Sequence, residues 1–277
     1  MKRLIVLLCA VTALNGCTSL QEVREYAGES AKFAGYKELT THFRDTFARE
    51  APYLSGNALD IAEANDRKRQ EAYGDLIRVH DTLALYMMTL AKLAGETTFD
   101  LSQGIDATAG QIKAHPELGI DAAQVGAISN LTKLISKWAL SAYQQDAVRD
   151  MINDGQAPLQ TSLDGMRTLL RLYRKTHDNE RKGVLGLFET EFALGKLQPK
   201  DPLLSALSRV HYQDKKAEYD AAERRFDTAE KGIERIAAGH TQLYRGVDRL
   251  SAREVKDALA DVAKDIKALR KQLQALQ

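Results

Sequence analysis

Apolar residues recur at alternating spacings of three and four positions along most of this 277-residue chain. The most regular stretch is 255–276, with Val255, Leu259, Val262, Ile266, Leu269, Leu273 and Leu276. Such spacing places an apolar seam along one side of a helix, and three heptads are the lower limit for a coiled-coil seam. No window alternates for long in the manner of a strand. The pattern therefore predicts an all-α protein.

The same periodicity divides the rest of the chain into helices bounded by proline, glycine and capping residues. We expect helices over 31–49, 57–94, 100–115, 121–153, 159–194 and 202–245, and a last helix from 252 onward. Gly155 and Pro158 are expected to separate two of these helices, because proline breaks helix interiors. The polar stretch 174–183 is either a turn or a polar zone within one long helix.

Three sequences have the form of a capping box, in which Ser or Asp is followed three residues later by Glu or Gln. They begin at Ser19, Asp121 and Ser251. If Ser19 caps a helix, residues 17–30 contain its first turns. The alternative is a flexible tether, which Gly28 would permit.

An expected helix of about 40 residues, such as 202–245, is about 60 Å long. A short turn joins it to the last helix, so the two make an antiparallel hairpin. We therefore expect an elongated up-and-down bundle of about six or seven helices with a C-terminal antiparallel helical hairpin. Residues 31–277 would form this single helical-bundle domain. Residues 83–93, apolar on nearly all sides, are expected at its centre.

The N-terminal residues follow a different plan. Met1-Lys2-Arg3 precedes the segment 4–14, which is apolar except at Thr12. This is the arrangement of a secretory signal peptide, and the segment is too short to span a bilayer. It ends in Leu14-Asn15-Gly16-Cys17, which resembles the lipobox of bacterial lipoproteins. Asn15 departs from that pattern, since Ala, Ser or Thr is commoner there.

The resemblance implies that residues 1–16 are a lipoprotein signal peptide, cleaved between Gly16 and Cys17. Cys17 would then carry the lipid that anchors the mature chain to a membrane. By similarity to enterobacterial lipoproteins, Thr18 favours the outer membrane, and we expect the protein to face the periplasm. The resemblance covers only residues 1–20, and no family is recognised in residues 20–277.

Composition limits the partners and the chemistry. The chain has 39 Lys and Arg and 38 Asp and Glu, and loss of residues 1–16 leaves a formal net charge of −1. A nearly neutral domain has no overall field to attract nucleic acid, so no nucleic-acid partner is expected. Cys9 leaves with the signal peptide and Cys17 is acylated. The mature chain then has no thiol for a disulfide, a metal site or a nucleophile.

No catalytic or cofactor motif stands out. None of the six histidines has an acidic residue three positions before it, and no two are four apart, which argues against di-iron and zincin sites. A nucleophile elbow, a Walker loop and a dinucleotide fingerprint are also missing. We therefore predict no cofactor and no enzyme activity. A single metal ion held by residues from distant helices remains an alternative.

One weak group of polar residues interrupts the apolar seams. His177, Glu180 and Glu191 lie on one expected helix, and His240 lies on another. If they face each other inside the bundle they need partners, since an unpaired buried charge is costly. They would then set helix register or line a ligand pocket. The other interpretation places the acids in solvent and the histidines in local hydrogen bonds. His80, on an apolar face, is expected to be a hydrogen-bonded core residue.

These observations predict a membrane-anchored, non-catalytic cell-envelope lipoprotein that acts as a helical scaffold or protein-interaction module. Its partner would be another envelope protein, and residues 255–276 would pair either within the chain or with a second copy. The first alternative is a small-molecule or cofactor-binding bundle in the periplasm, with 83–93 lining the pocket. The second is a membrane-active protein that uses an aromatic face between Phe33 and Phe47.

Overall fold

The structure is a computed structural model that describes residues 20–98, 101, 104–105, 112–139, 141, 145–194 and 202–276. Its α-helices are α2 (Gln21–Ala34), α3 (Glu38–Arg44), α4 (Thr46–Glu50), α5 (Asn57–Leu93), α7 (Ala122–Trp138), α8 (Gln145–Ala193), α9 (Pro202–Arg245) and α10 (Arg253–Ala275). The expected signal peptide, Gly16, Cys17 and Ser19 lie outside the described residues, as does most of the helix expected over 100–115.

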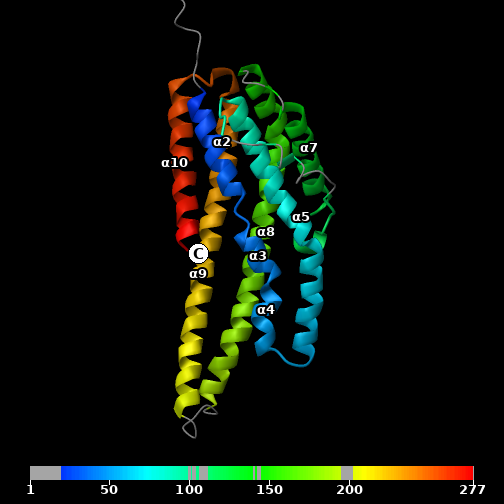
Figure 1. Ribbon diagram of the computed structural model, residues 1–277, viewed down its shortest axis with the longest axis vertical. Helices are drawn as coiled ribbons and strands as arrows, with labels where there is room; N and C mark the ends of the chain where they lie inside the picture. The colour runs from blue at the N-terminus through cyan, green and yellow to red at the C-terminus, as the bar shows by residue number, and fades with distance from the viewer. Residues whose placement is uncertain are drawn as a thin grey trace, which may run out of the picture.

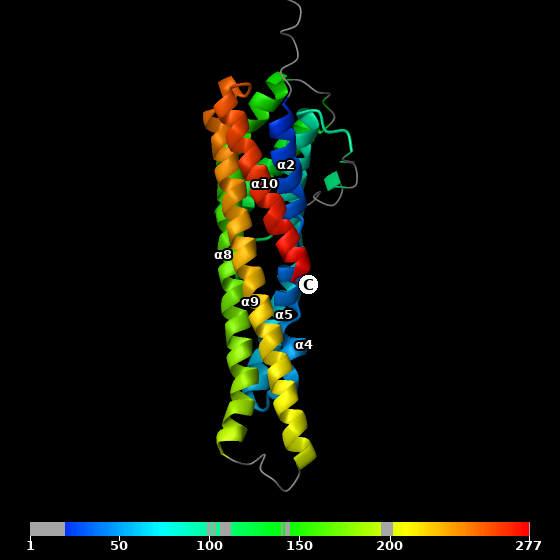
Figure 2. The ribbon, with the colours of Figure 1, turned by 90° about the vertical axis from the view of Figure 1, so that its left-hand side faces the viewer.

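The helices lie side by side in an elongated bundle (Figures 1 and 2). The described residues contain no strand, and their one isolated bridge joins His115 to Ile120. α9 and α10 run antiparallel at the C-terminal end, joined by the short turn η4 (Val247–Arg249). The predicted all-α bundle with a C-terminal hairpin is therefore confirmed.

The longest helices are α8 and α9, with 49 and 44 residues. At 1.5 Å per residue they are about 74 and 66 Å long. They continue past the rest of the bundle at the end opposite to the start of α2 (Figure 1). α10 covers only the half of α9 that is nearest the η4 turn (Figure 2).

α2 is an integral helix of the bundle. It packs against α5 and α10, and Tyr26 and Phe33 are buried. Tyr26 donates a hydrogen bond from its hydroxyl to the carbonyl of Ile236 on α9, 2.6 Å away. Residues 21–30 are therefore helical, as one of the two alternatives proposed. The residue that precedes the helix is Leu20, which makes no side-chain cap.

The prediction of a single helix over 31–49 is wrong. α2 ends at Ala34, and α3 and α4 follow as separate short helices on either side of Asp45. The break lets the aromatic residues reach different neighbours: Phe33 lies against Gly232 of α9, whereas Phe43 stacks on Tyr173 of α8 with ring centroids 4.4 Å apart. The proposed aromatic face is thus packed into the bundle at Phe33 and Phe43, and Phe47 is partly buried.

The prediction of a helix break near Gly155 and Pro158 is also wrong. α7 ends at Trp138, short of the expected 153, and α8 runs from Gln145 through both residues and through 174–183. Pro158 removes only the bond to the carbonyl of residue 154, which lies on an exposed residue and can bind water instead. Gly155 is needed for packing, because a Cβ there would lie 2.0 Å from the Tyr86 hydroxyl. Tertiary contact therefore outweighs the local breaking tendency.

Of the expected capping boxes, Asp121 confirms the prediction. Its carboxylate accepts from the backbone N–H groups of Ala123 and Gln124, and the Gln124 side chain accepts from the Asp121 N–H. The prediction of a capping box at Ser251 is wrong. The residue that precedes helix α10 is Ala252, and no side chain caps the helix. A neighbouring buried residue, Leu250, holds this turn against the core instead.

The core is centred on α5. Leu83, Leu85, Leu90 and Leu93 are almost completely buried, as expected for 83–93. His80, on the same helix, confirms the prediction of a hydrogen-bonded core residue. Its Nδ1 lies 3.0 Å from the carbonyl of Ala34 and its Nε2 lies 2.9 Å from the Thr40 hydroxyl.

The C-terminal seam packs within the chain. Leu259, Val262, Ile266 and Leu273 are buried, and α10 contacts α9 and α2. This is the first of the two arrangements that the heptads permitted.

Candidate functional site

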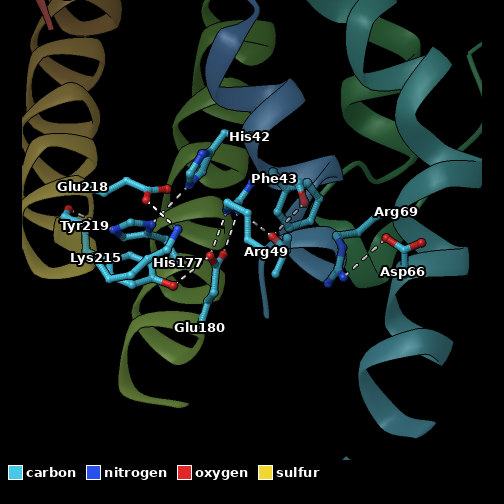
Figure 3. A network of polar contacts seen from close by, with 11 residues as sticks. His42, Phe43, Arg49, Asp66, Arg69, His177, Glu180, Lys215, Glu218 and Tyr219 are labelled. Atoms are coloured by element: carbon cyan, nitrogen blue, oxygen red, sulfur yellow. Dashed lines mark hydrogen bonds and ion pairs between the residues drawn. The ribbon is translucent and has the colours of Figure 1, made fainter. Parts of the chain in front are cut away.

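A buried polar cluster lies where α4, α8 and α9 meet (Figure 3). Arg49 of α4 donates from Nε and Nη2 to the two carboxylate oxygens of Glu180 on α8, at 2.8 and 2.7 Å. The hydroxyl of Tyr219 on α9 donates to the same carboxylate at 3.1 Å. The Glu180 side chain has no exposed surface. Its charge is therefore matched by a two-bond ion pair, the strongest form of charge-assisted contact.

Two histidines extend this cluster toward α3. His177 Nε2 lies 3.2 Å from the Tyr219 carbonyl, and since a carbonyl only accepts, Nε2 carries the proton. The unprotonated Nδ1 of His177 then accepts from His42 Nε2, 3.3 Å away. Burial lowers the pKa of His177, and burial together with the nearby Arg49 lowers the pKa of His42 to about 3. Both rings are therefore neutral at pH 7.

His240 belongs to a different cluster. Its Nδ1 lies 2.7 Å from Gln156 Oε1 on α8, and its Nε2 lies 2.8 Å from the Tyr86 hydroxyl on α5. Gln156 donates from Nε2 to Thr241, which leaves its oxygen to accept from His240. Burial lowers the pKa of His240 to about 3. The residue joins three helices through neutral hydrogen bonds.

The structure therefore divides the predicted cluster in two: His177 and Glu180 lie together, and His240 contacts a separate set of residues. The interpretation in which the acids reach solvent is wrong for Glu180, which is 1% exposed. The partners His42, Arg49 and Tyr219 carry no signal of this role in the sequence. A buried acid on an apolar seam does signal the need for a cation, but periodicity cannot tell which distant arginine supplies it.

In chemical terms both clusters hold helices together. Glu180 has its two oxygens bonded, and both nitrogens of His177 and His240 are occupied. Among the described residues, no group of three or more His, Cys, Asp or Glu side chains is placed to hold a metal ion.

A small cavity lies beside His80 of α5, but no residue of 83–93 lines it, so the expected pocket along 83–93 stays a prediction. The cavity beside His80, lined also by Thr40 and Tyr173, has a volume of about 30 Å³, enough for about one water molecule.

A second candidate is a surface, which we name the apolar tip: Leu187, Leu194, Leu203, Leu204, Leu207 and Val210. These residues lie near the free ends of α8 and α9. Leu203, Leu207 and Val210 are 69, 58 and 55% exposed, although their i, i+4, i+7 spacing forms one face of α9. Monomeric proteins rarely expose large apolar patches unless they bind something, so this stripe on α9 is a candidate binding surface.

Comparison with known proteins gives no relative: no family model, no curated protein and no solved structure matches this chain. Among the described helices, none is both long and apolar enough to cross a membrane.

Proposed function

We propose that this protein is a membrane-anchored, non-catalytic lipoprotein of the cell envelope, whose apolar tip binds an amphipathic helix of another envelope protein. The observation that carries the proposal is the exposed stripe of Leu203, Leu207 and Val210 on α9. The lipid on Cys17, the outer membrane and the periplasm remain implied by the lipobox resemblance alone.

The orientation of α9 near its start supports a missing helical neighbour. Tyr212 and Tyr219 of α9 contact α8 through hydrogen bonds to Glu189 and Glu180, whereas Leu203, Leu207 and Val210 are exposed. An amphipathic helix normally buries its aliphatic residues, but here this aliphatic stripe is left exposed. A partner helix on the leucine face would restore the usual arrangement.

The continuity of the bundle supports a helix as the partner. Nearer the η4 turn, α10 and α2 pack against α9, and Ile236 and Leu243 are buried. Beyond the end of α10, the start of α9 packs on α8 and on Tyr53 of the turn η2 (Ala51–Tyr53). A partner helix on the exposed face would extend the same helix-on-helix packing.

The positions of the two ends agree with this function. The start of α2, which follows the expected anchor, and the apolar tip lie at opposite ends of the molecule (Figure 1). A protein anchored through Cys17 would present the tip about 60–70 Å from its attached end, given the length of α9.

The proposal is tested by crosslinking in cells that make the full chain. A photoreactive amino acid at Val210 should give one discrete adduct with a second protein, joined through a helical segment with an apolar face. The Leu203→Gln/Leu207→Gln double variant should reduce that adduct at least tenfold, as expected for the loss of two central apolar contacts. Because both leucines are exposed, its thermal unfolding should not change.

The matched control carries the photoreactive residue at Lys216, which is exposed on another face of α9. This position should give no adduct with the same protein. A crosslink to a second copy of this chain, a crosslink to lipid, or an adduct that persists in the double variant would each contradict the proposed partner.

A further inference from the structure

Arg69 of α5 is a buried cation without a hydrogen-bonded counterion. It is 6% exposed, and neither Nε nor Nη2 has a hydrogen-bond partner. Its ion pair with Asp66 is long, with 3.7 Å between Nη2 and Oδ1 (Figure 3). An arginine side chain cannot give up its proton in a protein, so this charge persists at every accessible pH. Such a group is costly unless something supplies the missing acceptor.

Arg69 has two buried donor atoms without a partner, whereas Arg149, Arg167 and Arg225 have one each, at Nε, and the buried carboxylates of the described residues are all bonded. Glu180 accepts hydrogen bonds from Nε and Nη2 of Arg49. The Asp75 carboxylate accepts from Arg78 at 2.7 Å and lies 2.9 Å from Nε2 of His115. Arg49 therefore shows what the Nε and Nη2 edge of an arginine binds in this fold, which is a carboxylate. The same edge of Arg69 lacks one.

Arg69 also lines a cavity. The cavity lies between α4, α5 and α8, has a volume of about 280 Å³, and includes Thr46 and Asn179 in its wall. At about 30 Å³ per water molecule, it has room for a small organic molecule. Nε and Nη2 are covered in the ligand-free chain, so a ligand would be bound after the flexible arginine side chain turns toward the cavity.

The charges around the cavity indicate the class of ligand. Lys68 and Arg69 are balanced by Glu50 and Glu117 in the same wall. A polyanion such as phosphate would face both carboxylates, whereas a ligand with one negative and one positive group would match the wall. Burial raises the pKa of Glu50 and lowers the pKa of Arg69, so both groups are poorly solvated.

From this geometry we infer that the cavity at Arg69 binds a small zwitterion, such as an amino acid or a dipeptide. Its carboxylate pairs with Arg69, and its ammonium group lies toward Glu50. This site is independent of the apolar tip.

The test uses calorimetric titration of the full chain with glycylglycine, acetate and inorganic phosphate. Glycylglycine should bind with a millimolar Kd, more tightly than either acetate or phosphate. Arg69→Met should weaken glycylglycine binding at least tenfold. Arg67→Met is the matched control, because Arg67 lies on the same helix and its side chain is 63% exposed, and it should leave the Kd unchanged.

Arg69→Met should fold with an unchanged or higher Tm, since it removes an unpaired buried charge. If it fails to fold, Glu50→Gln provides the second variant. It keeps Arg69 and should weaken glycylglycine binding at least threefold without weakening acetate binding, since it removes a negative charge near Arg69. No binding of glycylglycine at 50 mM, tighter binding of phosphate, or a Kd for Arg69→Met equal to that of the wild type would overturn the inference.

Discussion

At the scale of single residues, the histidines of the core work as neutral hydrogen-bonding groups. Burial is the main cause that lowers the pKa of His42, His80, His177 and His240. In the unfolded chain their pKa values return to about 6.5. Below that pH the unfolded state binds protons that the folded state does not. Stability contributed by these residues is therefore complete above pH 6.5 and is lost as the pH falls.

His240 gives the clearest case, because it is fully buried and its folded pKa is about 3. Between pH 6.5 and pH 5 this residue alone should reduce the free energy of unfolding by about 2 kcal/mol. Urea unfolding of the wild type and of His240→Asn at pH 7 and pH 5 measures the effect. The variant should be less stable than the wild type at pH 7. On acidification to pH 5, its free energy of unfolding should fall by about 2 kcal/mol less than that of the wild type. Equal losses in both proteins would show that His240 is protonated in the fold.

At the scale of helices, two glycines of similar sequence context have opposite roles. Gly232 of α9 lies against α2, and a Cβ there would lie 1.8 Å from Phe33 Cζ. Gly183 of α8 is exposed, and a Cβ there would meet nothing within 4 Å. Gly232→Ala should lower the free energy of unfolding by about 1–3 kcal/mol through overpacking. Gly183→Ala should raise it by up to about 1 kcal/mol, since alanine favours helix. Chemical unfolding of both variants tests the contrast, and a stabilised Gly232→Ala would mean that α2 does not pack closely on α9.

The helices that sequence periodicity predicted well are those with no competing signal. α5, α9 and α10 begin and end within about one residue of expectation because proline, glycine and an apolar seam agree there. The errors arise where a local signal is overruled by a distant contact, as at Gly155, which is packed against Tyr86, 69 positions earlier in the chain. At the end of α2, Gly35 was a local stop signal, but the apolar spacing continues past it from Phe33 to Phe47 and favoured one helix.

The candidate site was predictable only in part for the same reason. His177 and Glu180 stand out because they interrupt an apolar seam on one helix. Arg49, which neutralises Glu180, is 131 positions away along the chain. No sequence feature indicated that Arg69 is buried, because an arginine in the polar half of α5 is expected to be exposed to solvent. Which charges become buried depends on how α4, α5 and α8 meet, and that arrangement is not encoded in the spacing of any one helix.

At the scale of the whole molecule, the bundle has two structurally different ends. Near the η4 turn, α2, α5, α8, α9 and α10 surround a common core. At the other end, the described residues of α8 and α9 form a small cluster of Val184, Leu185 and Tyr219, with partly buried aromatic neighbours. Stability should therefore come mainly from the first end. The second end is free to present the apolar tip at little cost to the fold.

The clearest test of this division is the seam of α10. Ile266 is fully buried against the core, so Ile266→Asp should place a carboxylate in an apolar site and cost more than about 4 kcal/mol. Thermal unfolding followed by circular dichroism should show a fall in Tm of about 10 °C or more. Ala268→Asp, at an exposed position on the same helix, adds the same charge and should leave Tm nearly unchanged. The alternative is a seam that joins two chains, and native mass spectrometry tests it. In that case the wild type would be a dimer, and Ile266→Asp would be a monomer with an unchanged Tm.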